Sequence, residues 1–331
     1  MAVGEDLFKK HCATSLVVPA PIELSFLTAS LCIFFTLTSI PGNLLIILAV
    51  VLNPNRNLRT PFNWLVVNLA VADLLVGLFT DPTMVVIHVK EGVGKKLSQA
   101  DRYSAHMSYF IACSASVLSI TTLAVERYLA VRKPNIYNSS VTSKRIVLTI
   151  VGTWLLSLSL PNVYFEVDYV SYSFIFANTC VAIASIITCL TCIMVLKTMR
   201  KRTKNMVKRA LPANRRTDFA FPTPALVVSA HETEMKVTKM FSVILLAMLC
   251  CYVPSTLCSY LLNFCKSCGC TSLHWFRDFH FVFVLMNSSV NFFPYALQSR
   301  KFRSAFMKII KRTQNSVENE TSLGVQHFTS T

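Results

Sequence analysis

Long apolar stretches dominate this chain, and short polar segments separate them. A helix that crosses a hydrocarbon layer of about 30 Å needs roughly 20 residues, and seven stretches approach or exceed that length. The seven predicted spans are Phe26–Leu52, Phe62–Val89, Ser104–Val131, Ile146–Leu160, Val170–Leu196, Val237–Leu262 and Phe279–Leu297. The fourth is short, and we expect it to extend by about one turn at each end. The pattern predicts an all-α membrane protein, a seven-transmembrane helix bundle.

Composition supports this class and weakens the soluble ones. Apolar residues make up 53% of the chain and charged residues only 15%, whereas a soluble domain carries about 25% charged residues. The net charge of +16 raises the question of a nucleic-acid partner. The basic residues lie between the apolar stretches and form no polar face of their own, so we expect no nucleic-acid partner.

The distribution of Lys and Arg predicts the orientation. Of the 32 basic residues, 24 lie in or beside one set of connections and the carboxyl-terminal tail, and 8 lie on the other side. Because cytoplasmic segments retain positive charge, the amino terminus is expected outside and the carboxyl terminus inside. The predicted domains are an extracellular tail (1–23), the membrane bundle (24–298), an interfacial helix (299–312) and a disordered cytoplasmic tail (313–331).

Few ionisable residues interrupt the spans. They include Asp73, Asp81 and the pair Glu126-Arg127. An intramembrane charge costs about 2.5–3.5 kcal/mol on insertion scales, so each is a candidate functional residue.

The neighbours of these residues form an ordered set of motifs. The third span ends Leu-Ala-Val-Glu126-Arg127-Tyr128. The others, in chain order, are Gly42-Asn43, Asn68-Leu-Ala-Val-Ala-Asp73-Leu, Trp154 and Cys251-Tyr252-Val253-Pro254. The set resembles the rhodopsin-like (class A) G-protein-coupled receptors over roughly residues 24–310. The resemblance implies a plasma-membrane receptor whose partners are a heterotrimeric G protein and arrestin.

The same resemblance implies a switch at the cytoplasmic end of the third span. Its expected members are Glu126, Arg127, Tyr128, Glu234 and Tyr295. Glu126 can neutralise Arg127 locally, and Glu234, at the start of the sixth span, can hold Arg127 across the helix gap in the resting state. The alternative is an interfacial arginine that only extends toward water.

A mid-membrane sodium site is also implied. Its residues are Asp73, Ser116, Asn287, Ser288 and Asn291, all with hard oxygen atoms that suit such an ion. The alternative is a water-bridged polar cluster that holds helices together. We expect no other cofactor.

Several positions depart from the family pattern. The seventh span reads Asn291-Phe-Phe-Pro294-Tyr295, where the family has Asn-Pro-x-x-Tyr, so the helix kink should move by about half a turn. Tyr252 replaces the usual tryptophan of the sixth span and Met248 the usual phenylalanine. The fifth span contains no proline.

The cysteines also depart from the pattern. Arg102 stands where a disulfide cysteine normally ties the third span to the second extracellular loop, and that loop has no cysteine. Four outer cysteines remain, which are Cys12, Cys265, Cys268 and Cys270. We expect one bridge within the third extracellular loop and one from this loop to the tail, with the connectivity open. The spacing of the loop cysteines and His274 also resembles a zinc site.

The missing bridge, short second loop, cysteine-rich third loop and proline-free fifth span occur together in the melanocortin-like receptor group. We therefore interpret the chain as similar to that group. The candidate pocket residues are Asp81, Tyr109, Cys113, Tyr252 and Phe281, with Glu166 and Asp168 at the rim. Aromatic residues are common in spans and rim acids are usually solvated, so a purely structural role is equally open.

The pocket residues favour some ligands over others. Tyr109 occupies the position where amine receptors place an aspartate, so a peptide or lipid-like ligand is favoured over an amine. The seventh span has no lysine, which excludes a retinal Schiff base. An adenosine-like nucleoside receptor is the alternative within this class, and a membrane transporter or channel is the alternative outside it. No inverted repeat or polar pore stripe supports a transporter, and no nucleophile and base pattern supports an enzyme.

Overall fold

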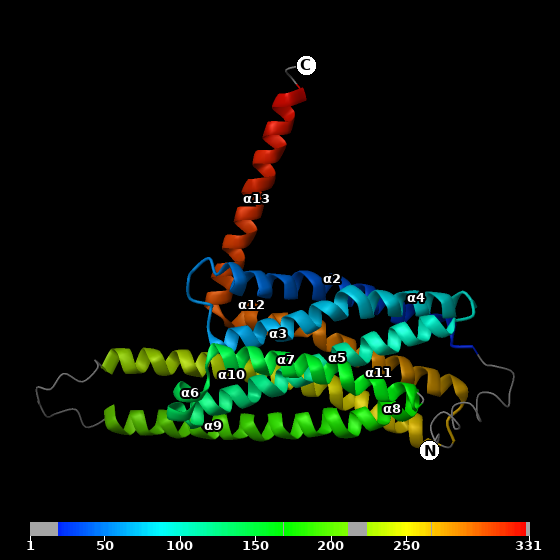
Figure 1. Ribbon diagram of the computed structural model, residues 1–331, viewed down its shortest axis with the longest axis horizontal. Helices are drawn as coiled ribbons and strands as arrows, with labels where there is room; N and C mark the ends of the chain where they lie inside the picture. Colours follow the sequence, from blue (N-terminus) through cyan, green and yellow to red (C-terminus); the bar gives the residue numbers. More distant parts are fainter. Residues whose placement is uncertain (1–18, 168, 211–223, 266, 329–331) are drawn as a thin grey trace, which may run out of the picture.

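The computed structural model describes residues 19–167, 169–210, 224–265 and 267–328. Every regular element in these ranges is a helix, and the long helices run side by side along one axis (Figure 1). The prediction of an all-α membrane bundle is confirmed.

The first four spans match the predicted apolar stretches closely. The first is α2 (Ile22–Leu52) and the third is α5 (Gln99–Arg132). The second contains α3 (Pro61–Leu75), the π-helical η1 (Val76–Thr80) and α4 (Asp81–Gly92). The short helix α6 (Pro134–Ser140) leads to the fourth span, α7 (Ser143–Ser159) followed by the 3-10 segment η2 (Leu160–Phe165).

The last three spans are longer than predicted. The fifth contains α8 (Tyr169–Phe176), the π-helical η3 (Ala177–Val181) and α9 (Ala182–Ala210), and the sixth is α10 (Pro224–Phe264). The seventh contains α11 (Cys270–Val290) and α12 (Phe292–Gln298), and α13 (Arg300–Phe328) follows it. Helices α9 and α10 extend past the other spans at one end, which the charge distribution assigns to the cytoplasm (Figure 1).

Six helices in the described part of the chain are long and apolar enough to cross a membrane. The seventh span, α11 with α12, carries more polar residues and packs against α2 and α10, which closes the bundle. Its helix begins at Cys270, nine residues before the predicted Phe279. Hydropathy misses these residues because several are polar, although His274 and Asp278 among them are buried in the interior.

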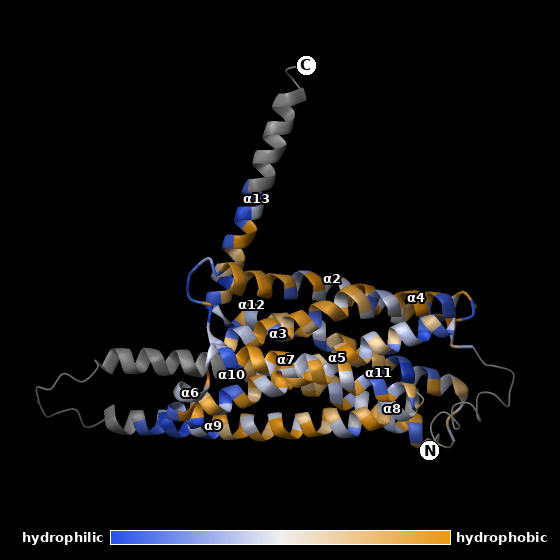
Figure 2. Ribbon diagram, viewed as in Figure 1, coloured by the Kyte–Doolittle hydropathy of each residue, from blue (hydrophilic) through white to orange (hydrophobic). Residues whose placement is uncertain are grey.

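Apolar residues fill most of the length of the long helices, and strongly hydrophilic residues lie mainly in the loops and near the helix ends (Figure 2). Leu148 on α7 is 70% exposed, whereas Asn43, Asp73 and Asn291 are buried among the helices. A soluble protein shows the opposite arrangement, so this surface is suited to lipid. Helix α5 is central, because it packs against α3, α7 and α9.

Helix irregularities replace some of the expected proline kinks. The fifth span has no proline, and its irregularity is the π-helical η3. In the seventh span the break falls between Val290 and Phe292. Pro294 lies four residues after Val290, so it cannot donate the helical hydrogen bond to the Val290 carbonyl, and α11 ends there.

Helix α13 runs crosswise to the bundle axis (Figure 1). Phe302, Ala305 and Phe306 are buried against the bundle, as the expected interfacial helix requires, whereas Ile310 is 40% exposed. The helix continues to Phe328, beyond the predicted end of the interfacial helix at residue 312, and the disordered tail stays a prediction. No proline or glycine interrupts the sequence before Gly324, which permits the helix to continue.

Candidate functional site

The inner end of α5 holds a compact charged group. Arg127 Nε lies 2.5 Å from Glu126 Oε2, and Arg127 Nη2 lies 2.5 Å from Glu126 Oε1. The guanidinium carbon also lies 4.1 Å from the centre of the Phe62 ring on α3. The Tyr137 hydroxyl on α6 donates a hydrogen bond of 2.8 Å to Glu126 Oε1. Arg127 is thus held by its own helix and by an aromatic face, at only 14% exposure.

The other expected switch residues are placed separately. Tyr128 packs beside Val131, Val195 and Met199, which join α5 to α9. Tyr295 is buried, with its ring 5.3 Å from that of Phe302, and its hydroxyl has no hydrogen-bond partner among the described residues. Glu234 belongs to α10, but its side chain lies outside the described part, so the proposed contact with Arg127 stays a prediction.

The mid-membrane polar residues converge on Asp73. Ser116 donates to Asp73 Oδ1 at 3.2 Å, and Asn291 donates to Asp73 Oδ2 at 2.8 Å. Asn287 donates to the Ser116 hydroxyl at 3.3 Å. Ser288 is buried next to this group, and its carbonyl accepts from Asn43 at 3.1 Å. The structure therefore brings all five predicted sodium-site residues to one interior region between α3, α5 and α11.

These residues offer free oxygen atoms. Within the described residues, Asn287 Oδ1 and Asn291 Oδ1 are buried and lack a hydrogen-bond partner. Amide oxygens next to a carboxylate are hard donors that suit a small cation or an ordered water molecule. The donor set thus fits the sodium ion that the resemblance implied.

A second polar chain joins three spans nearby. Asn68 on α3 donates to the Ser119 hydroxyl on α5 at 2.7 Å, and Trp154 Nε1 on α7 donates to Asn68 Oδ1 at 2.9 Å. Helix α7 otherwise exposes most of its surface, so this bond anchors it to the bundle.

The outer half of the bundle contains an aromatic group centred on Tyr109. The Tyr109 hydroxyl lies 3.1 Å from His280 Nε2, and its ring packs edge-on against Phe281 with centroids 5.0 Å apart. His280 also lies 3.1 Å from the Ser173 hydroxyl and 2.8 Å from the Ser255 hydroxyl. His280 therefore links four spans, a role that the sequence analysis missed because the residue lies in an apolar stretch next to Phe281.

The remaining pocket candidates lie deeper or at the rim. Asp81 is fully buried, and neither carboxylate oxygen has a hydrogen-bond partner in the described part of the chain. Cys113 and Tyr252 are also buried, with Cys113 a free thiol. Glu166 is exposed at the end of η2, and Asp168 lies outside the described residues.

An ionic cluster at the outer end was not predicted. Arg277 donates to both Glu91 oxygens, at 2.9 and 2.8 Å, and to Asp278 Oδ1 at 2.7 Å. His88 Nδ1 lies 3.2 Å from Glu91 Oε2 and 3.6 Å from Asp278 Oδ2, and Thr28 donates to Asp278 at 3.2 Å. The cluster joins α2, α4 and α11. Arg277 lies 186 residues after Glu91 in the sequence, and no motif connects the two segments, so the sequence analysis could not pair them.

The connection between α10 and α11 contains a disulfide between Cys265 and Cys268. Cys270 is disulfide-bonded as well, and Cys12 lies outside the described residues. Because Cys265, Cys268 and Cys270 are all disulfide-bonded, none of them offers a thiolate to the zinc site considered above. The described residues contain no cluster of metal-binding side chains.

Comparison with known proteins identifies the bundle. The family model for the 7 transmembrane receptor (rhodopsin family) matches residues 42–295. The human adenosine receptor A2a is 27% identical over 311 residues, which cover 82% of this chain and 69% of that receptor. The horse (Equus caballus) adenosine receptor A2a is 27% identical over 83% of this chain and 70% of its own length. The Caenorhabditis elegans muscarinic acetylcholine receptor gar-2 is 30% identical over 45% of this chain and 22% of its own length.

These relatives correct the expected closeness to the melanocortin-like group. The human and horse adenosine receptors match 82% and 83% of this chain. The expected similarity to melanocortin receptors depends mainly on missing features, such as the absent loop bridge and fifth-span proline. Separate lineages can lose the same feature, so a shared absence is weak evidence of relationship. The family model covers the bundle from Gly42 to Tyr295, and the chain therefore belongs to the rhodopsin family (class A) of seven-transmembrane receptors.

Proposed function

We propose that this chain is a plasma-membrane receptor that converts binding of an extracellular ligand into nucleotide exchange on a heterotrimeric G protein. The observation that carries the proposal is the Glu126 and Arg127 pair at the inner end of α5, with both nitrogen contacts at 2.5 Å. A largely covered guanidinium that can exchange one carboxylate partner for another is a two-state element. Arrestin is proposed as a second cytoplasmic partner.

The resting state keeps Arg127 on Glu126. In this proposal Glu234 adds a second carboxylate from α10, and activation moves α10 outward and frees Arg127 for the G protein. Glu126 keeps Tyr137 as a partner throughout the resting state. A receptor whose Glu126 cannot hold Arg127 should therefore signal without ligand.

We further propose that sodium binds at Asp73 and favours the resting state. When bound, the ion would supply positive charge to a buried carboxylate. Asp73, Ser116 and the amide oxygens of Asn287 and Asn291 would hold it, with Ser288 beside them. The amide oxygens of Asn287 and Asn291, which have no hydrogen-bond partner among the described residues, favour a sodium site over a purely structural polar cluster.

The proposed ligand is a peptide or lipid-like molecule with a positively charged or hydrogen-bond-donating group. Asp81 supports it, because a buried carboxylate without a hydrogen-bond partner gains a partner when such a group enters. Glu91 and Asp278 are less available, because Arg277 already pairs with both. An amine that requires a carboxylate at the Tyr109 position is disfavoured, because Tyr109 lies against His280.

A nucleoside is the second candidate. The adenosine receptors that match 82% and 83% of this chain favour it. His280 and the hydroxyls of Ser173 and Ser255 suit the hydroxyl groups of a sugar, and the rings of Phe281 and His106 suit a flat base.

The test compares these ligand classes on one purified receptor. Wild type, Asp81→Asn and Glu166→Gln receptors in nanodiscs are mixed with G protein and screened with basic peptides, lysolipids and nucleosides. We expect a cationic ligand to stimulate nucleotide exchange in wild type and Glu166→Gln, and to need at least about tenfold higher concentration in Asp81→Asn. Activation by a neutral nucleoside that is unaffected by Asp81→Asn would overturn the ligand assignment and support the second candidate.

A further inference from the structure

One face of α9 points away from the bundle. Ile183, Ile186, Leu190 and Ile193 are between 48% and 58% exposed and recur every three or four residues. The opposite face contains the buried Cys192, Val195 and Met199, and α9 packs against α5. Residues three or four apart share one side of a helix, so the isoleucine and leucine side chains form a single outward strip. In a seven-span membrane protein that strip faces lipid.

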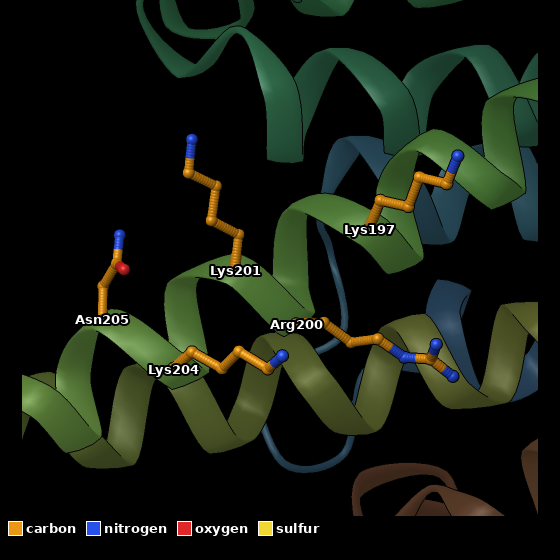
Figure 3. Close-up of a pocket in the computed structure, with 5 residues that line it drawn as sticks. All are labelled: Lys197, Arg200, Lys201, Lys204 and Asn205. Atoms are coloured by element: carbon orange, nitrogen blue, oxygen red, sulfur yellow. The ribbon is translucent and has the colours of Figure 1, made fainter.

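The strip continues toward the cytoplasm as positive charge. Lys197, Arg200, Lys201 and Lys204 are exposed and keep the same spacing after Ile193. With Asn205 they line an open pocket of about 360 Å³, and Lys201 and Asn205 extend to the same side of α9 (Figure 3). Lys197 lies about 6 Å along the helix axis from Ile193, and Lys204 about 10 Å farther. The cations therefore begin where the apolar strip ends, at the depth of the lipid headgroups.

These charges have no anionic partner among the described residues. Across the residues that the structure describes, none of the four side chains forms an ion pair or a hydrogen bond to the protein. Arg202, on the side of α9 that faces α5, behaves differently and donates to the Val131 carbonyl at 2.6 Å. Four unpaired cations within two helical turns repel one another, and a multivalent anion would relieve that repulsion.

We propose that this outward basic face of α9 binds the phosphorylated headgroup of a phosphoinositide in the inner leaflet. Four cations on one pocket match a headgroup with several phosphate charges, whereas a singly charged lipid would engage fewer of them. The pocket faces away from α5 and hence from the Arg127 region. The proposal depends on the orientation of the bundle and not on coupling to a G protein.

The test uses the full chain in phosphatidylcholine nanodiscs with a small fraction of fluorescent phosphatidylinositol 4,5-bisphosphate. Bound lipid is measured by energy transfer to a dye on the receptor and by native mass spectrometry. One variant carries K197Q, R200Q, K201Q and K204Q. The matched control carries R300Q, K301Q, K308Q and K311Q on α13, which removes the same charge from another exposed cytoplasmic helix. A third variant, K197R/K201R/K204R, keeps the charge.

We expect the α9 glutamine variant to bind the phosphoinositide at least about tenfold more weakly than the control and the arginine variant. Phosphatidylserine binding should fall by the same small factor in both glutamine variants. Excess soluble inositol trisphosphate should displace the lipid only at concentrations far above those of the lipid itself. Equal losses in the two glutamine variants, or an equal loss for phosphatidylserine, would overturn the proposal in favour of general attraction to anionic membranes.

Discussion

The Tyr137 hydroxyl on α6 donates a hydrogen bond of 2.8 Å to the Glu126 carboxylate on α5. This bond ties the loop between the third and fourth spans to the residue that holds Arg127. Burial, followed by the negative charge of Glu126, raises the pKa of the Tyr137 hydroxyl, so it remains a protonated donor at physiological pH. The loop therefore stabilises the same arrangement that keeps Arg127 on its own helix.

Tyr137→Phe should raise signalling without ligand. The change removes one hydrogen bond to a charged group, and a shift of about 1 kcal/mol corresponds to roughly fivefold in the ratio of the two states. The measurement is basal nucleotide exchange at matched receptor amounts. Tyr103→Phe, at the outer end of α5, is the control and should leave the rate unchanged. A basal rate in Tyr137→Phe equal to wild type would argue against the role of this bond.

Sodium should stabilise the receptor through Asp73. Replacing choline chloride by sodium chloride is expected to raise the melting temperature of purified wild type by about 2–4 °C, provided that sodium exceeds its dissociation constant severalfold. Ser116→Ala should reduce the rise, because Ser116 touches Asp73. Ser114→Ala, on the same helix but without a contact to Asp73, should keep it. The same rise in wild type and Ser116→Ala would indicate that the polar cluster is structural.

Trp154→Phe should loosen α7. The change removes the hydrogen bond to Asn68 while keeping an aromatic ring. Interhelical bonds of this kind contribute about 0.6–1.7 kcal/mol, which predicts a fall in melting temperature of a few degrees. Trp64→Phe is a suitable control because Trp64 is 39% exposed. Equal falls in both variants would mean that ring volume matters and the hydrogen bond does not.

Arg277→Gln should be among the most damaging substitutions at the outer end. It leaves Glu91 and the fully buried Asp278 without their cation, and breaking such a pair costs about 3–5 kcal/mol. The measurement is thermal unfolding and the yield of folded receptor. The double variant Arg277→Gln/Glu91→Gln should recover part of the loss, and Arg102→Gln at an exposed site should cost little. A double variant that is less stable than the single one would contradict the pairing.

Local sequence information was enough to predict the spans and their motifs. Apolar length located all seven spans, because the lipid-facing residues of helices such as α2 and α7 are apolar in sequence as well as in space, although the seventh span was predicted to begin nine residues too late. Asp73, Ser116 and Asn291 could be grouped because the family motifs fix their registers on different helices. The structure brings them within hydrogen-bonding distance, whereas their role in sodium binding remains a prediction.

Features that depend on contacts between distant segments could not be read from the sequence. His280 links four spans through bonds to Tyr109, Ser173 and Ser255, yet nothing next to it in the sequence indicates them. The early start of α11 was missed for a similar reason, since Arg277 and Asp278 look like loop residues until Glu91 is placed beside them. The π-helical segments have no distinctive local composition.

The most direct test of coupling through Arg127 is basal nucleotide exchange on purified G proteins of the four main classes. Wild type, Glu126→Gln and Glu234→Ala receptors are reconstituted in nanodiscs and compared with nanodiscs that contain no receptor. The account predicts that Glu126→Gln raises exchange on at least one G protein by about fivefold over wild type, because Glu126 accepts hydrogen bonds from Arg127 Nε and Nη2. Glu234→Ala is expected to give a smaller rise. Exchange that equals the receptor-free rate for all three receptors, on all four G proteins, would contradict it.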